Sequence, residues 1–336
     1  MAWKNPWYDP SLSHHTPEGF RNLEPTAQQK GDLQRWRRER KAQGNPRPPA
    51  QGYEHFIQRW WQAADLSGDK DCVWWLGHAC LLLRNAGRYT LIDPALSSRA
   101  SPLSFYGPRR KTPPALVIED LPSLDVVLIS HNHYDHLDRR TIKKIVARFP
   151  KVTFVVPLGL KKWFRRHGVQ RVVQLDWWQQ THTDGLSIYA VPARHWSMRT
   201  LWDRNRSLWC GWVIKVGKLN LWFSGDSGYS DNLLEIARRL GPFNLAALPV
   251  GAYAPKWFMH GQHMDPDQAV SLHHALGQPV TMAIHWGVFE LADEPLDEPP
   301  GALEGAMQAA GLDAGLFKTW KIGGKMLLEN IIDEDS

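Results

Sequence analysis

Ser130-His131-Asn132-His133-Tyr134-Asp135-His136-Leu137-Asp138 is the stretch of the chain from which the fold can be inferred. It holds the pattern HxHxDH, which places three histidines and one aspartate within six residues. A chain of this composition would contain that pattern by chance roughly 0.002 times. We therefore favour a metal-binding loop over a solvated loop that happens to be rich in histidine.

The residue types in this loop suit a divalent metal. Imidazole and carboxylate groups together are ligands that zinc accepts. Alternate residues of an extended loop point the same way, so His131 and His133 can share one metal. Asp135 and His136, which follow them, can turn toward a second.

Further polar residues follow predicted strands along the chain. We expect strands at 125–129, 186–191, 219–223 and 280–284, with helices between several of them. The helix after the HxHxDH loop carries an apolar stripe at Ile142, Ile145, Val146 and Phe149, another covers about 231–240 and stops at Gly241, and a third is capped by Asp265 and Pro266 and ends before Gly277. Open α/β sheets bind ligands at the carboxyl ends of their strands.

His195, Asp226 and His285 each come just after one of these strands. Taken singly, they have ordinary explanations: a hydrogen-bonded loop histidine, a turn aspartate and a satisfied core histidine. Taken together with the HxHxDH loop, they complete the ligand set that two metals need. Metal binding lowers the pKa of water toward about 7, so such a site can hydrolyse substrates at neutral pH.

These residues, in this order, resemble the metallo-β-lactamase superfamily. Further motifs are similar to one branch of it, the N-acyl-phosphatidylethanolamine-hydrolysing phospholipase D family, over about residues 70–325. They include Trp75-Leu76-Gly77-His78-Ala79, Asp93-Pro94, Leu175-Asp176-Trp177-Trp178, Gly251-Ala252-Tyr253 and Gln262-His263-Met264-Asp265-Pro266.

The resemblance implies an α/β fold, the αββα sandwich, with two Zn²⁺ per chain. It implies one zinc on His131, His133 and His195, a second on Asp135, His136 and His285, and Asp226 bridging the two. Asp135, Asp226 and His263 are then the expected catalytic residues. The resemblance also implies a homodimer.

The segment around His263 is expected to lie near the substrate phosphate. His263 would bind the phosphate or protonate a leaving group, although it could instead only support its loop. Gln262, Tyr253 and Tyr134 are further expected substrate-binding residues. Trp257, Phe258 and Met259 would suit an acyl chain, with core packing as an equally plain alternative.

Composition limits the class of protein. The chain has 336 residues, of which 43% are hydrophobic and 22% charged, so it can bury a large core. Its 3 cysteines include no CxxC pair, which argues against disulfides and cysteine-based zinc sites. We expect a cytoplasmic protein with neither a signal peptide nor a membrane span, which could still contact a membrane surface.

Two parts of the chain differ in character. Residues 1–60 are rich in proline and contain the run Arg35 to Lys41, so we expect an extended arm with one short basic helix. Residues 61–330 are expected to form the hydrolase domain. The net charge of +6 suits anionic partners such as phospholipids. A nucleic-acid partner is disfavoured because no RNP or KH signature occurs.

We therefore expect a binuclear zinc phosphodiesterase of phospholipase D type acting on phospholipids. A lactonase or a nuclease on the same two-metal site remains the alternative, because one fold hosts many chemistries. A metal-binding module without catalysis is a third interpretation, and the complete ligand set argues against it.

Overall fold

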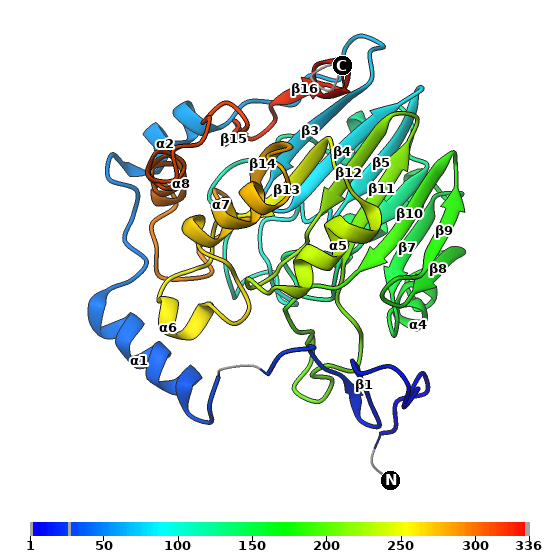
Figure 1. Cartoon of the computed structure of the whole chain (residues 1–336), viewed down its shortest axis with the longest axis horizontal. Coiled ribbons are helices and arrows are strands. Elements are labelled where there is room, and N and C mark those ends of the chain that lie inside the picture. Colours follow the sequence, from blue (N-terminus) through cyan, green and yellow to red (C-terminus); the bar gives the residue numbers. More distant parts are fainter. Residues whose placement is uncertain (1–2, 26–27, 333–336) are drawn as a thin grey trace.

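The computed structural model describes residues 3–25 and 28–332, and it contains two seven-stranded sheets packed face to face with helices outside them (Figure 1). This is the expected αββα sandwich. The strands that lie between the layers are buried along most of their length, as in β3 (Cys72–Gly77), where all six residues are inaccessible to solvent. Such continuous apolar runs form strands that are covered on both faces.

The first sheet has the strand order β16-β3-β4-β5-β6-β7-β8. The meander of β3, β4 and β5 is antiparallel, and β5 to β8 run parallel. Its remaining strands are β4 (Cys80–Asn85), β5 (Arg88–Ile92), β6 (Val126–Leu128), β7 (Thr153–Pro157), β8 (Arg171–Leu175) and β16 (Lys325–Leu327).

The second sheet has the order β15-β14-β13-β12-β11-β10-β9. Strands β12 to β15 are parallel, and β9 to β12 are antiparallel. Its strands are β9 (Gln180–Thr183), β10 (Leu186–Val191), β11 (Gly211–Val216), β12 (Leu219–Phe223), β13 (Leu245–Pro249), β14 (Val280–Ile284) and β15 (Phe317–Lys318). The predicted strands at 186–191, 219–223 and 280–284 are confirmed.

The helices of the domain lie between strands and over the sheets. Helices α5 and α7 cross the outer face of the second sheet (Figure 1). The set comprises α3 (Arg139–Arg148), α4 (Lys161–Arg166), α5 (Asn232–Leu240), α6 (Lys256–Met259), α7 (Pro266–Ala275), α8 (Glu298–Ala309), α9 (Glu329–Ile332) and the 3₁₀ turn η1 (Ile118–Asp120).

The capping residues predicted for two helices can be compared with the structure. Helix α7 begins with the predicted cap, extended to a capping box: Gln268 N donates to Asp265 Oδ1 at 2.9 Å, and Asp265 N donates to Gln268 Oε1 at 3.2 Å. Helix α5 ends at Leu240 as predicted, but Gly241 has φ −73° rather than a left-handed conformation. Glycine is needed there for space, because a Cβ would lie 2.6 Å from the Ala237 carbonyl oxygen.

The arm contains more regular structure than the sequence indicated. The expected basic helix is α1 (Asp32–Gln43), and it is joined by a second helix, α2 (Gly52–Trp60), and a small hairpin of β1 (His15–Thr16) and β2 (Gly19–Phe20). Figure 1 shows the arm lying along the domain, with α1 (blue) beside α6 (yellow).

Polar contacts hold the start of the arm on the domain. Asp176, which follows β8, accepts hydrogen bonds at 2.7 Å from His14 Nε2 and at 2.8 Å from His15 Nε2. All three residues are buried, and the His14 ring stacks on Trp177 at 4.4 Å. We call this group the arm latch.

Within the described part of the chain, no helix combines the length and the hydropathy needed to cross a bilayer.

Candidate metal centre

Two groups of metal-ligating side chains meet at one edge of the two sheets. The loop after β6 supplies four of them, and the others follow β10, β12 and β14 or lie in the turn between β3 and β4. The first group is His131, His133, His195 and Asp226, and the second is His78, Asp135, His136 and His285. The predicted strand-end arrangement is therefore observed, and it brings all seven predicted ligands together.

The first group presents converging imidazole nitrogens. His131 Nε2 lies 2.8 Å from His133 Nδ1, and His195 Nε2 lies 3.2 Å from that same atom. Burial lowers the pKa of His133 to about 4 and that of His195 to about 3, so both rings are neutral at pH 7. Neutral imidazoles bind metals through their lone pairs, and three such nitrogens facing one point fit a cation.

The second group surrounds Asp135. Its Oδ2 lies 2.8 Å from His78 Nε2, 3.3 Å from His136 Nε2 and 3.5 Å from His285 Nε2. Burial alone would lower the pKa of His285, but the carboxylates of Asp226 and Asp135 raise it to about 9. The carboxylates likewise raise the pKa of His136, so the second group gathers negative charge at a place where a metal cation would offset it.

Asp226 stands between the two groups. Its Oδ2 lies 3.1 Å from His285 Nε2 and 3.2 Å from His136 Nε2 on one side, and 3.6 Å from His195 Nε2 and 3.8 Å from His131 Nε2 on the other. Burial raises the pKa of Asp226, but the charges of His136 and His285 outweigh burial and hold the pKa well below its ordinary value.

Several buried polar atoms of the centre have no hydrogen-bond partner among the described residues. They are His133 Nε2, His136 Nε2, Asp226 Oδ1, both ring nitrogens of His285, Nδ1 of His78 and Nδ1 of His263. Buried polar groups are normally satisfied, so orphans gathered at one point indicate a missing ligand. Their chemistry, imidazole and carboxylate, is that of a divalent metal site.

Neighbouring groups fix the orientation of the ligands. Asp93 is completely buried after β5, and its Oδ2 lies 2.7 Å from His136 Nδ1. His195 Nδ1 lies 2.9 Å from the Gln262 carbonyl oxygen. Each contact takes one ring nitrogen and leaves the other, Nε2, facing the centre, as partners of metal-bound histidines usually do.

The arm also supports the centre, and no motif in the sequence predicted this contact. Asn22 pairs with the backbone of His195: its Nδ2 donates to the His195 carbonyl oxygen at 2.9 Å, and its Oδ1 accepts from the His195 N–H at 3.1 Å. Trp209 Nε1 donates to the same Oδ1 at 3.2 Å. A residue 173 positions away thus holds the peptide that carries a candidate ligand.

His78 is a second residue that the site prediction missed. Besides its contact with Asp135, its carbonyl oxygen accepts from the His285 N–H at 2.9 Å. His78 and His285 have φ of 53° and 64°, a left-handed conformation that is costly for residues other than glycine and is often found at functional sites. The signal was the Trp75 to Ala79 motif, in which this histidine stands.

His263 lies inside the centre rather than beside it. Its ring centroid is 5.0 Å from that of His195 and 5.1 Å from that of His285. With Asp226 and His285 it forms a further group whose ligand atoms lie close together. Burial holds the pKa of His263 well below its ordinary value, so the ring is neutral at pH 7.

A pocket of about 610 Å³ opens onto the centre, and we call it the metal pocket. Of the predicted substrate residues, Gln262 and His263 line it, together with Phe258 and Met259 from the apolar cluster. The other lining residues used below are His133, Asp135, His195, Trp196, Arg204, Asp226, Leu291 and the α1 residues Asp32, Leu33, Trp36 and Arg37.

Tyr134 and Tyr253 are placed elsewhere. The Tyr134 hydroxyl donates to the Arg199 carbonyl oxygen at 2.8 Å, and its ring lines a neighbouring pocket. Tyr253 is 7% exposed, and its hydroxyl donates to Glu298. The HxHxDH loop forms a turn at Tyr134, where the His136 N–H donates to the His133 carbonyl oxygen at 3.1 Å, rather than the extended segment expected from the sequence.

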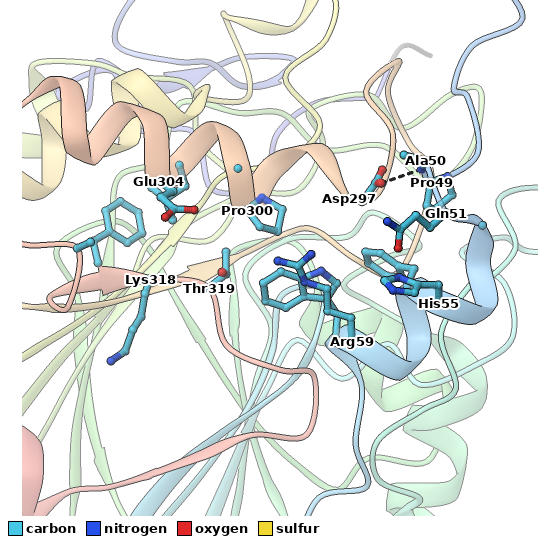
Figure 2. Close-up of a pocket in the computed structure, with 17 residues that line it drawn as sticks. Pro49, Ala50, Gln51, His55, Arg59, Asp297, Pro300, Glu304, Lys318 and Thr319 are labelled. Atoms are coloured by element: carbon cyan, nitrogen blue, oxygen red, sulfur yellow. Dashed lines mark hydrogen bonds between the residues drawn. The ribbon is translucent and has the colours of Figure 1, made fainter.

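A separate pocket of about 480 Å³ lies between α2 and α8 (Figure 2). His55 and Arg59 face it from α2, and Pro300 and Glu304 face it from α8. None of the predicted site residues, all within the described chain, lines it. The metal pocket, which the proposed ligands line, is therefore the candidate active site.

Comparison with known proteins shows the family of the chain. The family model described as "Beta-lactamase superfamily domain" matches residues 88–286. The chain is 39% identical over 246 residues to N-acyl-phosphatidylethanolamine-hydrolyzing phospholipase D 1 of Caenorhabditis elegans, covering 70% of this chain and 69% of that protein. It is 34% identical to the mitochondrial enzyme of the same name in Saccharomyces cerevisiae, of which it spans 50%.

Solved structures agree on the fold. The isothiocyanate hydrolase from Delia radicum gut bacteria matches with a TM-score of 0.60 at 19% identity, covering 76% of this chain and 98% of that one.

Proposed function

Because the chain belongs to the beta-lactamase superfamily, in the branch of the N-acyl-phosphatidylethanolamine-hydrolysing phospholipases D, and is a metal-dependent hydrolase, we propose that it is a binuclear zinc phosphodiesterase acting on N-acyl phospholipids. It would cleave the phosphodiester on the headgroup side, as a phospholipase D does. The products would be phosphatidic acid and an N-acylated headgroup alcohol.

The position of Asp226 carries the two-metal part of this proposal. One carboxylate oxygen lies within 3.8 Å of histidines from both ligand groups, and the other oxygen has no hydrogen-bond partner among the described residues. We assign His131, His133 and His195 to one zinc and Asp135, His136 and His285 to the other, with Asp226 shared. His78, bonded to Asp135, would orient that carboxylate.

Two zinc ions bound there would supply a water nucleophile at neutral pH and offset charge on the phosphoryl group. The residues of the chain do the rest. Asp93, Gln262 and Asn22 keep the ligands in place. His263, with its Nδ1 unpaired among the described residues, would hold the substrate phosphate through a ring N–H. Alternatively, it would take up the proton lost by the attacking water and pass that proton to the leaving alkoxide.

In this reaction water oxygen bonds to phosphorus as the bond from phosphorus to the headgroup oxygen breaks. The departing oxygen takes one proton and leaves as an alcohol. The apolar side of the metal pocket, with Phe258, Met259 and Leu291, suits an acyl chain.

A lipid substrate also requires access to a lipid surface, and two loops support such contact. Leu201 and Trp202 are 81% and 77% exposed, and Phe105 and Tyr106 are 77% and 71% exposed. Segments next to both loops line one pocket, through Ser101 and Thr200. Exposed aromatic residues of this kind are typical of the bilayer interface, and we include peripheral membrane contact in the proposed function.

The test is a product analysis with the full chain and its metals. N-acyl-phosphatidylethanolamine, a lactone, single-stranded RNA and a simple phosphodiester are offered in parallel, the lipid in H₂¹⁸O. We expect phosphatidic acid carrying one ¹⁸O on phosphorus, together with N-acylethanolamine. Label recovered in the alcohol, or hydrolysis of the lactone or RNA alone, would overturn the proposal.

Metal analysis tests the cofactor separately. We expect about two zinc ions per chain in protein purified without chelator. A content near zero, or a predominance of iron or manganese, would contradict the zinc assignment.

A further inference from the structure

Helix α1 of the arm forms one wall of the metal pocket, although it lies outside the residues matched by the family model. The helix is fixed by three of its own side chains. Trp36 stacks on Phe258 with ring centroids 5.0 Å apart and donates from Nε1 to Asp293 at 3.0 Å. The Arg35 guanidinium covers the Trp257 ring at 4.1 Å, and Arg40 pairs with Asp293 at 3.5 Å.

Arg37 is different from these neighbours. Its side chain lines the metal pocket and, within residues 3–25 and 28–332, makes no hydrogen bond, ion pair or ring contact. Arg38, the next residue, is also exposed and its side chain also has no partner in the described chain, but it does not line the pocket. The helix is thus held by its other residues in a position where Arg37 faces the site.

A second unpaired cation faces the same pocket from the domain. Arg204 has no acidic partner in the described part of the chain, and its guanidinium lies 4.5 Å from the centroid of the Trp196 ring. Trp196 in turn packs on His133, with ring centroids 4.3 Å apart. Arg204 is therefore one aromatic ring away from a proposed metal ligand.

The acidic residues of the pocket do not neutralise these two arginines. Asp135 and Asp226 belong to the metal centre, and Asp32 accepts from the Gln29 N–H at 2.6 Å. The phosphodiester of the substrate, with its single negative charge, would be met by the metals. In an N-acyl ethanolamine headgroup the nitrogen is an amide and carries no charge, so such a headgroup leaves the arginines without an anion.

We propose, resting on the proposed function, that the metal pocket selects N-acyl phospholipids whose headgroup carries a second acidic group, a carboxylate or a phosphate, bound by Arg37 of the arm and Arg204 of the domain. Guanidinium groups bind both anions through paired, charge-assisted hydrogen bonds. The arm would then set substrate choice, while the domain supplies the chemistry.

The experiment compares two substrates that differ by one carboxylate. N-palmitoyl-phosphatidylserine and N-palmitoyl-phosphatidylethanolamine are offered to the zinc-loaded full chain in micelles of a neutral detergent, so that no other anionic lipid is present. We expect the kcat/KM of the serine lipid to exceed that of the ethanolamine lipid by about tenfold. Arg37→Gln and Arg204→Gln should each bring this ratio close to one.

Arg38→Gln is the matched control, because it removes the same charge from the same helix outside the pocket. It should leave the ratio unchanged. Equal kcat/KM for both lipids in the wild-type chain, or an equal fall of the ratio in the Arg38→Gln variant, overturns the proposal. A preference that appears only when anionic lipid is added to the micelles assigns the arginines to the surface and also overturns it.

A binding measurement separates this proposal from the proposed function. Non-hydrolysable phosphonate analogues of the two headgroups are titrated into the same proteins by calorimetry. Tighter binding of the carboxylated analogue, lost in Arg37→Gln and kept in Arg38→Gln, supports the anion site even if neither lipid is hydrolysed. Equal binding of the two analogues rejects the site, whether or not the lipids are hydrolysed.

Discussion

The two sides of the metal pocket are built in different ways. The metal centre consists of side chains at strand ends, buried and held by the sheets and by neighbours such as Asp93. The opposite wall, α1, has no buried residue and is attached through a few polar and aromatic contacts. A rigid centre and a lightly attached wall suit different tasks. Catalysis needs fixed ligands, whereas the arm, under the proposal above, would set substrate choice.

The largest loss of activity should follow from a substitution in the metal centre. Asp226→Asn weakens the link between the two ligand groups, so both metals should be lost together. We expect activity to fall beyond the about 10²–10⁴-fold that removal of one proton-transfer group costs. The fold should survive, because its apolar core is independent of the metals. Near-normal turnover with two zincs in this variant would show that Asp226 does not bridge.

The next effect concerns His263, which touches the centre without belonging to the proposed ligand set. His263→Ala should keep two zincs and lose about 10²–10⁴-fold in rate if the ring transfers a proton or holds the phosphate. Aryl phosphodiesters need little help from an acid, so an equal loss on aryl and alkyl substrates would assign His263 to phosphate binding. A lower zinc content would instead place His263 among the ligands.

Asn22 joins the arm to the metal centre, and its substitution should break this contact. Asn22→Ala removes both hydrogen bonds to the His195 backbone, and we expect zinc affinity to fall about 10–100-fold, as for other partners of metal ligands. Competition with a chromogenic chelator measures this affinity. Leu23→Ala, next to it and 41% exposed, is the control and should leave the affinity unchanged. If both variants behave like the wild type, the arm does not support the centre.

The smallest effect, a change in the free energy of unfolding, is expected from a substitution in the arm latch. Burial would raise the pKa of Asp176, but its bond to His14 and the charges of His14 and His15 lower it overall. A carboxylate whose pKa is depressed by folding contributes stability above its unfolded-state pKa of 3.8, and that stability is lost as pH falls through the folded-state pKa. Asp176→Asn should therefore cost about 1–3 kcal/mol at pH 7.

The pH dependence provides the check on the latch. Urea denaturation of wild type and Asp176→Asn at the same pH gives the difference in the free energy of unfolding, so loss of metal in acid affects both proteins alike. The difference should shrink below about pH 4. A difference that stays constant from pH 7 to pH 3 would show that the charge of Asp176 does not hold the arm.

The domain could be predicted from sequence because its signals are local. The HxHxDH loop, the cap at Asp265 and the strand before His285 each lie within a few residues, and the resemblance joins them into one fold. Asn22 offers no such signal, since it stands in an irregular, proline-containing segment and meets its partner only in the folded chain. Helix α1 was expected, but nothing in its sequence indicated which side chains would face the pocket.

The direction of individual side chains was also not predictable from the sequence. Tyr134 lies between proposed ligands in sequence, yet its hydroxyl bonds to Arg199 in another pocket. Tyr253 belongs to the Gly251-Ala252-Tyr253 motif, but its hydroxyl donates to Glu298. Conversely, the need for Gly251 is visible only in three dimensions, because a Cβ there would lie 2.2 Å from the His285 carbonyl oxygen.

The pairing of Asn22 with His195 means that hydrogen–deuterium exchange at the His195 amide reports on how the arm is held. The His195 amide hydrogen is donated to Asn22 Oδ1, so it can be replaced by deuterium only when that bond opens. A metal held by His195 would act on the same peptide as the arm. Any free energy that this metal adds to the docking of the arm must then equal the free energy that the arm adds to metal binding. Deuterium uptake at the His195 amide would therefore report metal occupancy through the hydrogen bond that joins a proposed ligand to Asn22 of the arm.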